Sequence, residues 1–137
     1  MEINQISGAI VDAALHVHMQ LGPGLLESVY EQCLIIELQD RGLRCASQIP
    51  LPIIYAGHRI DAAYRLDVLV EDTVVVEIKA VEHVLPVQKA QLVSYLRLSG
   101  KKLGLLLNFN VPRLRDGIFR VVNRLEETSE LPLPDLP

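Results

Sequence analysis

Hydrophobic positions recur along this chain with two different periods, which predict helices at both ends of the chain and strands between them. Over residues 4–21 apolar side chains return every three or four positions, the spacing of an amphipathic helix. Gly22-Pro23-Gly24 ends this helix, because glycine permits a helix C-terminus and proline prevents continuation. A second helix is predicted over about 25–41 and a third over 87–99, each followed by a glycine.

Between the second and third helices the pattern becomes extended. Two runs rich in β-branched residues, 64–70 and 74–80, flank the polar tip Glu71-Asp72-Thr73 and predict a β-hairpin. Residues 45–55 are expected to be an irregular or edge strand, because they contain two prolines. The continuous apolar run 103–108 has the length of a buried strand.

A last short helix is expected over 116–125, so the predicted order is ααβββαβα. A helix that joins the hairpin to the late buried strand predicts a right-handed crossover. The expected fold class is therefore α/β (α+β), with a mixed β-sheet flanked by helices on both sides.

Core packing also predicts the register of the hairpin. Side chains alternate along a strand, so each strand has one apolar face; these faces contain Tyr64, Leu66, Val68 and Val70, and Val74, Val76, Ile78 and Ala80. A slip of one residue would turn a whole face away from the core. Val70 is therefore expected to pair with Val74, which places Asp67 opposite Glu77 and leaves Lys79 two residues further on the same face.

This register brings two carboxylates and an ammonium group together. Carboxylates that cannot neutralise each other favour a bound divalent cation. A neighbouring lysine can hold an attacking water or stabilise charge on a phosphate. The alternative at this stage is a surface salt bridge between Lys79 and either acid, which would contribute little.

Polar residues on the helices add further candidates. Glu27 lies in the first turn of the second helix, where the helix dipole also favours a carboxylate. Gln88, Gln91 and Tyr95 form a polar stripe on the third helix, which follows the hairpin directly. Asn108, at the end of the late strand, could cap that strand or line a site.

Length and composition indicate one domain over residues 1–125, followed by an acidic, proline-rich flexible tail over 126–137. Half of the 137 residues are hydrophobic, but no apolar run is long enough to span a membrane and no signal-peptide pattern is present. The two cysteines have no metal-ligand spacing. A cytoplasmic protein with no membrane association is expected.

The net charge of −4 is distributed unevenly. Residues 1–78 carry 4 basic and 11 acidic side chains, whereas residues 79–124 carry 9 basic and 2 acidic ones. The basic residues that could give the C-terminal half a phosphate-attracting surface are Lys89, Arg97, Lys101, Lys102, Arg113, Arg115, Arg120 and Arg124. Ordinary solvated helix faces are the alternative.

Several segments in order resemble a known family. The run Gly24-Leu-Leu-Glu27-Ser-Val-Tyr30 resembles the signature of the GxxExxY family. The resemblance continues, with its spacing intact, from about residue 4 to 123 through Tyr64-Arg65-x-Asp67, Val76-Glu77-Ile78-Lys79-Ala80, Gln91-x-x-x-Tyr95-Leu96 and Leu107-Asn108-Phe109-Asn110. That family is placed in the PD-(D/E)XK superfamily, whose fold is similar to that of restriction endonucleases, with an αβββαβ core.

The resemblance implies a metal centre. Asp67, Glu77 and the backbone carbonyl of Ile78 would bind one or two Mg²⁺ or Mn²⁺ ions, and Glu27 would add a ligand or orient one through water. Leu66 departs from the superfamily pattern, which has proline at this position, but the neighbouring carboxylate is retained.

The resemblance also implies roles for three further side chains. Lys79 would position the attacking water and stabilise the pentavalent phosphate, while the metal would lower the pKa of that water. Gln91 and Tyr95, similar to the QxxxY element of RecB-like members, would contact the metal-bound water or the nucleic-acid backbone.

The function expected is therefore a metal-dependent nuclease that hydrolyses phosphodiester bonds in DNA or RNA. The first alternative is a catalytically silent module of the same fold that binds nucleic acid or a protein partner, as a homodimer or in a complex. A second alternative is a metal-binding module with no role in nucleic-acid chemistry, which would show no salt-dependent affinity for DNA or RNA.

Overall fold

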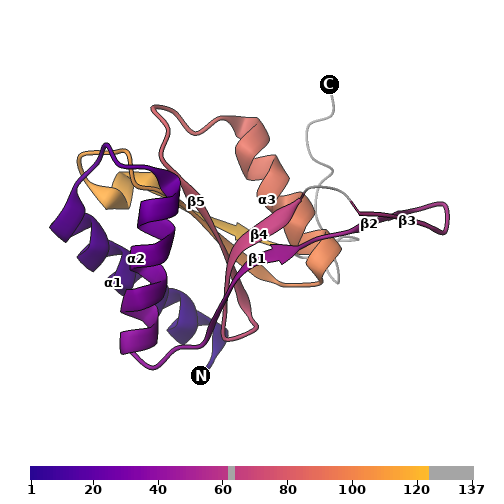
Figure 1. Cartoon of the computed structure of the whole chain (residues 1–137), viewed down its shortest axis with the longest axis horizontal. Helices are drawn as coiled ribbons and strands as arrows, with labels where there is room; N and C mark the ends of the chain where they lie inside the picture. The colour runs from indigo at the N-terminus through magenta and orange to yellow at the C-terminus, as the bar shows by residue number, and fades with distance from the viewer. Residues whose placement is uncertain (62–63, 124–137) are drawn as a thin grey trace.

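The computed structural model describes residues 1–61 and 64–123 and forms a mixed sheet flanked by helices (Figure 1). The helices are α1 (Ile3–Leu21), α2 (Glu27–Asp40) and α3 (Pro86–Ser99), with a short 3₁₀ helix, η1 (Leu114–Gly117). The sheet has the order β1-β4-β5-β6-β7, formed by Cys45–Pro50, Arg65–Val70, Val74–Lys79, Leu103–Asn108 and Ile118–Val122. A separate two-stranded ribbon projects from the body and consists of β2 (Ile53–Tyr55) and β3 (His58–Ile60).

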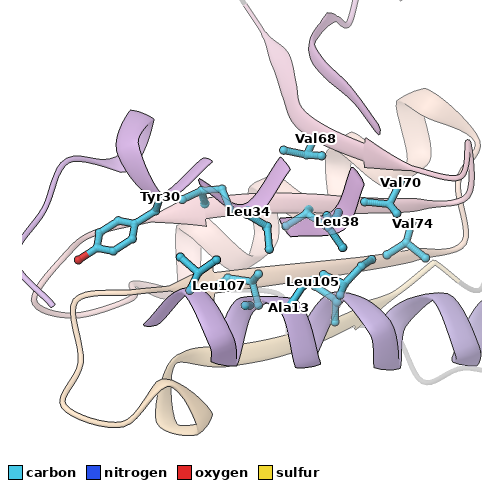
Figure 2. Packing of buried hydrophobic residues seen from close by; sticks show 14 of the residues in the cluster. Ala13, Tyr30, Leu34, Leu38, Val68, Val70, Val74, Leu105 and Leu107 are labelled. Carbon is cyan, nitrogen blue, oxygen red and sulfur yellow. The ribbon is translucent and has the colours of Figure 1, made fainter. Parts of the chain in front are cut away.

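The larger core lies between the sheet and the pair α1–α2. Figure 2 shows Leu34 and Leu38 of α2 and Ala13 of α1 against valines of the hairpin and leucines of β6. The amphipathic spacing of α1 explains this arrangement, since its buried positions recur on one face. Burial of these apolar side chains is the main driving force that fixes both helices to the sheet.

A second core lies on the opposite face of the sheet, under α3. Leu92 and Leu96 of α3 pack there with Val75 of β5 and Leu106 of β6. Because both faces of the central strands are covered, β6 is buried along its whole length and has a continuous apolar sequence. The predicted fold class, a mixed sheet with helices on both sides, is confirmed.

The crossover through α3 makes β5 and β6 parallel. Their pairing runs from Val74 opposite Leu103 to Lys79 opposite Asn108. Gly104 of β6 lets the helix approach the sheet closely, since a Cβ there would lie about 3.0 Å from the side chain of Leu92. Because β5 and β6 are parallel and in register, their C-terminal ends lie side by side at the same end of the sheet.

The helix expected over 116–125 is wrong for the residues of this range that the structure describes, 116–123. The segment instead forms η1 and then β7, which pairs antiparallel with β6 at the edge of the sheet. Its side chains alternate, because Ile118 packs toward the larger core whereas Phe119 and Val121 pack under α3. The unpaired edge of β6 favours a strand here, and a short run cannot reveal this from its own periodicity.

The predicted order ααβββαβα also omitted part of the extended region. The segment expected as one irregular strand divides into β1 and β2, and the turn at Gly57 leads into the further strand β3. Gly57 has a φ of 79°, and Ala56 before it has a φ of 51°, which suits a tight two-residue hairpin.

The predicted apolar face of residues 64–70 is correct for Val68 and Val70 but wrong for Leu66 and for Tyr64, whose ring lies against Tyr95 of α3. Leu66 packs in the core under α3, whereas Val68 and Val70 pack toward α1 and α2. The pairing of β1 with β4 is interrupted at Gln48, which has a φ of 52° and stands opposite Asp67 in the register. The local disruption of the ladder accompanies the change of face.

Two predictions fall on residues without a structural description. The flexible tail over 126–137 and the basic residue Arg124 lie outside the described ranges. Within those ranges, the structure has no helix that combines the length and the apolar character required to cross a bilayer.

Candidate active site at the divergence of β4 and β5

The central feature of the site is the point where β4 and β5 stop pairing. Val70 pairs with Val74, as predicted, and the ladder continues to Val68 opposite Val76. The next two residues, Asp67 and Glu77, place their carboxylates where the ladder would continue.

The carboxylates accept hydrogen bonds from backbone groups of the two strands. The Asp67 N–H donates to Glu77 Oε1 at 3.3 Å, and the Ile78 N–H donates to Asp67 Oδ2 at 2.8 Å. The N–H and C=O of one strand residue point to the same neighbouring strand, so the Ile78 carbonyl is also expected on the Asp67 side. Each carboxylate uses one oxygen in these bonds and has a second oxygen for another ligand.

Glu77 is a buried acid beside another acid. Only 6% of its surface is exposed. Burial and the negative charge of Asp67 raise the pKa of Glu77 to about 8, while Lys79 acts in the opposite direction. An electrostatic environment that penalises two anions is one that a cation would relieve.

We expect Glu77 to make the folding stability depend on pH. Its pKa is about 8 in the folded protein and near 4.5 when unfolded, so the unfolded chain loses this proton first as pH rises. This contribution to stability is fully present below about pH 4.5 and is lost as pH rises toward 8. Without divalent metal, stability should fall by as much as about 1.4 kcal/mol per pH unit in this window.

Urea unfolding between pH 5 and 8 measures this effect, and Glu77→Gln should remove most of the decline. Glu82→Gln is the matched control, because Glu82 has a side chain that is 90% exposed. The prediction is wrong if the control and Glu77→Gln change the pH profile equally.

Glu27 approaches the hairpin from the N-terminus of α2. It is the first residue of that helix, and its Oε1 accepts a hydrogen bond from the Ala80 N–H at 3.3 Å. The bond connects the start of α2 with the residue that follows β5. The structure therefore brings Glu27 to the same end of β5 as Lys79.

Tyr30 fixes the loop that precedes Glu27. Its ring is fully buried and stacks on Phe109, with 4.5 Å between ring centroids. Its hydroxyl donates to the Gly22 carbonyl at 2.6 Å and accepts from the Leu25 N–H at 3.1 Å. Tyr30 thus holds the tight turn between α1 and α2 rather than facing the acids.

A cleft of about 450 Å³ opens between α2 and the hairpin. The residues that line it are Glu27, Ser28, Glu31, Gln48, Asp67 and Ile78. Burial raises the pKa of Glu31, the charge of Asp67 raises it further, and a hydrogen bond from Gln48 opposes both. That bond joins Gln48 Nε2 to Glu31 Oε1 at 2.9 Å.

Glu31 and Gln48 were not among the predicted site residues. The sequence contained one indication that Glu31 belongs to the site, since Glu31 follows Glu27 by one helical turn and shares its face. The sequence contained no such indication for Gln48, because only the pairing of β1 with β4 places it opposite Asp67.

Lys79 ends β5 beside the two acids. Its backbone carbonyl accepts a hydrogen bond from the Phe109 N–H at 2.9 Å, which fixes its position against the end of β6. Its charge acts on the Glu77 carboxyl, yet within residues 1–61 and 64–123 Lys79 forms no ion pair. The alternative of a simple surface salt bridge is therefore not supported.

Asn108 positions the chain that follows Lys79. The Asn108 side chain is almost fully buried, donates from Nδ2 to the Val81 carbonyl at 2.9 Å and accepts from the Val81 N–H at 3.0 Å. Gly117 passes so close to the Asn108 backbone carbonyl that any side chain there would collide with it. Asn108 thus fixes the segment after β5 against the end of β6.

The polar stripe on α3 divides into three different environments. Gln88 caps its own helix, since its Oε1 accepts from the Leu85 N–H at 2.8 Å. Tyr95 is half-buried, and its pKa is raised by burial and by the nearby charges of Glu77 and Asp67. Gln91 is exposed and has no hydrogen bond to the acids in the described part of the chain.

Two of the described basic residues of the C-terminal half lie at opposite ends of β6. Lys101 precedes β6 and pairs with Asp72 at the hairpin tip, whereas Arg113 follows β6 and pairs with Asp116. The length of β6 separates these two groups by about 17 Å. Lys89 lies elsewhere, 4.0 Å from the ring centre of Phe119.

The donor groups fit a hydrated magnesium ion. Asp67, Glu77 and the Ile78 carbonyl offer hard oxygen ligands, and Mg²⁺ usually keeps several waters in addition to one or two carboxylates. The paired carboxylates, one of them buried, supply the negative environment such an ion requires. Across the described ranges, however, no three potential side-chain ligands converge in a geometry suited to a metal ion.

Comparison with the curated proteins found no match, and comparison with the solved structures found none either. A family model described as the PD-(D/E)XK nuclease superfamily matches residues 4–121, which is most of the chain. The match spans both helices that cover the larger core, the hairpin with its two acids, and the crossover to β6. The chain belongs to the PD-(D/E)XK nuclease superfamily.

Proposed function

We propose that this protein is a Mg²⁺- or Mn²⁺-dependent nuclease that hydrolyses phosphodiester bonds in DNA or RNA. The observation that carries the proposal is the pair Asp67 and Glu77, whose carboxylates interrupt the ladder beside Lys79. A buried acid with a raised pKa, adjacent to a second acid and a lysine, lowers folding stability and is characteristic of reactive sites.

In this proposal Asp67, Glu77 and the Ile78 carbonyl hold the metal, and Glu27 adds or orients a ligand through water. The metal, when bound, supplies a Lewis acid for the phosphate and lowers the pKa of a bound water. The hydrogen bonds from the Asp67 and Ile78 N–H groups fix the two carboxylates before any ion arrives. This preorganisation lowers the cost of binding a cation between like charges.

Lys79 stabilises the negative charge that develops on the phosphate and positions the attacking water. Its freedom from an ion pair within the described residues supports this role, because its ammonium group can turn to the substrate. Tyr95 lies near the acids and donates a hydrogen bond from its phenol to the substrate backbone or to bound water. Gln91, exposed on the same helix, contacts the nucleic-acid backbone.

We also propose that the chain belongs to the GxxExxY family within this superfamily. The three signature residues have separate uses that explain their spacing. Gly24 has a φ of 100°, Glu27 begins α2 and bonds to the end of β5, and Tyr30 holds the loop between α1 and α2. A substitution of Gly24 or Tyr30 would displace the Glu27 carboxylate from the hairpin, and most substitutions of Glu27 would remove it.

A catalytically silent module that binds nucleic acid or a protein partner is the second candidate. The observation that favours it is the lack, across residues 1–61 and 64–123, of a converged set of three metal-ligating side chains. Such a module would keep the fold and its affinity for nucleic acid but would not cleave the nucleic acid.

Cleavage of a mixed panel of DNA and RNA, single- and double-stranded, distinguishes the two candidates. Wild-type protein should cleave at least one substrate with Mg²⁺ or Mn²⁺ and none with EDTA. Binding without cleavage by either metal would instead support the silent module. Protein that neither cuts nor binds any substrate would overturn both nucleic-acid candidates and leave a protein partner as the object of search.

A further inference from the structure

An aromatic pair lies beside the acids on the α3 side of the sheet. The rings of Tyr64 and Tyr95 are inclined at 53°, with 6.0 Å between their centroids. Tyr95 is half-buried against the core under α3, whereas Tyr64 is 40% exposed. One member of the pair is therefore anchored and the other presents a ring to solvent.

The pair is close to the reactive groups. Tyr64 precedes Asp67 by three residues, which is about 10 Å along an extended chain. Tyr95 lies close enough to Glu77 and Asp67 for their charges to act on its phenol. A nucleotide whose phosphate binds at the metal that Asp67 and Glu77 are proposed to hold can therefore place its own base, or the adjacent base, at the tyrosines.

The backbone holds Tyr64 in this position. Its carbonyl accepts a hydrogen bond from the Leu51 N–H at 2.9 Å, just beyond the last pairing of β1 with β4. Leu51 is itself buried under α3 together with Leu66. The exposed ring of Tyr64 is thus attached to backbone that is hydrogen-bonded to Leu51.

Core packing does not account for the exposed ring. A tyrosine that serves only the core places its ring among apolar neighbours, as Tyr30 does with no exposed surface. Exposed aromatic faces beside a phosphate site provide stacking surfaces for nucleic-acid bases, at about 1–3 kcal/mol per base. Bases within a duplex are already stacked on their neighbours, so such a surface favours unpaired ones.

We propose that Tyr64, supported by Tyr95, forms a stacking platform for an unpaired base next to the cleaved phosphate, so that the substrate is single-stranded or locally unpaired DNA or RNA. This inference rests on the nuclease function proposed above. Tyr64 is a specificity residue here, since it contacts the substrate base and takes no part in the chemistry.

Binding of short oligonucleotides that carry a central 2-aminopurine tests the platform. The probes are single-stranded DNA, single-stranded RNA and the corresponding duplex DNA, with Ca²⁺ in place of Mg²⁺ and gel analysis to confirm that they remain intact. Anisotropy of an end label gives affinity, and quenching of 2-aminopurine reports stacking. The variants are Tyr64→Ala, Tyr64→Phe and, as a matched control, Tyr55→Ala on the projecting ribbon, where the tyrosine is 72% exposed.

The wild-type protein should bind a single strand more tightly than the duplex and quench the probe. Tyr64→Ala should weaken single-strand binding about 10-fold and abolish the quenching. Tyr64→Phe, which keeps the ring, and Tyr55→Ala should bind within about twofold of wild type. Comparison of the DNA and RNA strands shows which nucleic acid the platform accepts.

Unchanged affinity and quenching in Tyr64→Ala would overturn the platform while leaving the nuclease proposal intact. Equal losses in Tyr55→Ala, or an equal effect on the duplex, would overturn it as well. If wild-type protein binds none of the probes, the nuclease proposal fails together with the platform. Circular dichroism of each variant verifies that the fold is retained, which the exposure of both tyrosines favours.

Discussion

Asp67→Ala is expected to reduce metal-dependent cleavage by about 1,000-fold or more, because it removes a proposed metal ligand and the stabilisation of several kcal/mol that the ion would supply. The alanine variant also leaves the Ile78 N–H without the carboxylate that accepts its hydrogen bond. Asp67→Asn separates these two effects, since the amide oxygen can accept the same bond but has no charge. Both variants should lose activity, and Asp67→Asn should unfold at nearly the wild-type urea concentration.

Lys79→Ala should lower the rate about 100- to 1,000-fold through loss of the charge stabilisation that we propose Lys79 provides at the phosphate. Lys102→Ala is the matched control, because Lys102 is exposed and lies before β6, at the end of the sheet opposite the acids. Initial rates on the best substrate of the panel measure both changes. Activity within threefold of wild type in Asp67→Asn or Lys79→Ala would refute the assignment of the reactive groups.

Tyr30→Ala is expected to destabilise the fold by about 3–5 kcal/mol, since it removes a fully buried aromatic ring from the larger core. The ring stacks on Phe109, so its loss leaves a cavity between α2 and the end of β6. Urea unfolding followed by circular dichroism measures the change. Tyr55→Ala, on the exposed ribbon, should alter stability by less than about 0.5 kcal/mol.

Tyr30→Phe isolates the hydroxyl of this residue. The variant keeps the stacked ring but loses the hydrogen bonds to Gly22 and Leu25, at a cost of about 1 kcal/mol. Because the same loop leads into Glu27, cleavage should fall more in this variant than its small loss of stability explains. A loss below about 1 kcal/mol in Tyr30→Ala would contradict the structural role assigned to the ring.

The site brings together groups from four separate parts of the chain. β4 and β5 supply the acids and Lys79, α2 supplies Glu27 and Glu31, β1 supplies Gln48, and α3 supplies Tyr95. The two hydrophobic cores fix these elements from opposite faces of the sheet. Stability and site geometry are therefore coupled, which is why Tyr30 matters to both.

The register of the hairpin followed from local sequence alone. Side chains alternate with a period of two, and apolar faces separated by a three-residue tip allow one pairing that buries both. The alternation of side chains therefore predicts Val70 opposite Val74, and with it the proximity of Asp67 and Glu77. The helices α1, α2 and α3 could also be predicted from the sequence, because glycines and Pro23 mark their boundaries.

Contacts between distant segments determined the rest. β7 could not be recognised because its strand conformation comes from the free edge of β6, and Leu66 changed face where the β1–β4 ladder is interrupted at Gln48. The burial of Glu77 and the contact of Gln48 with Glu31 likewise need α2, α3 and the sheet in place. Sequence periodicity specifies which face of an element is apolar, whereas the pKa of a carboxyl and the shape of a cleft depend on what the whole fold packs around them.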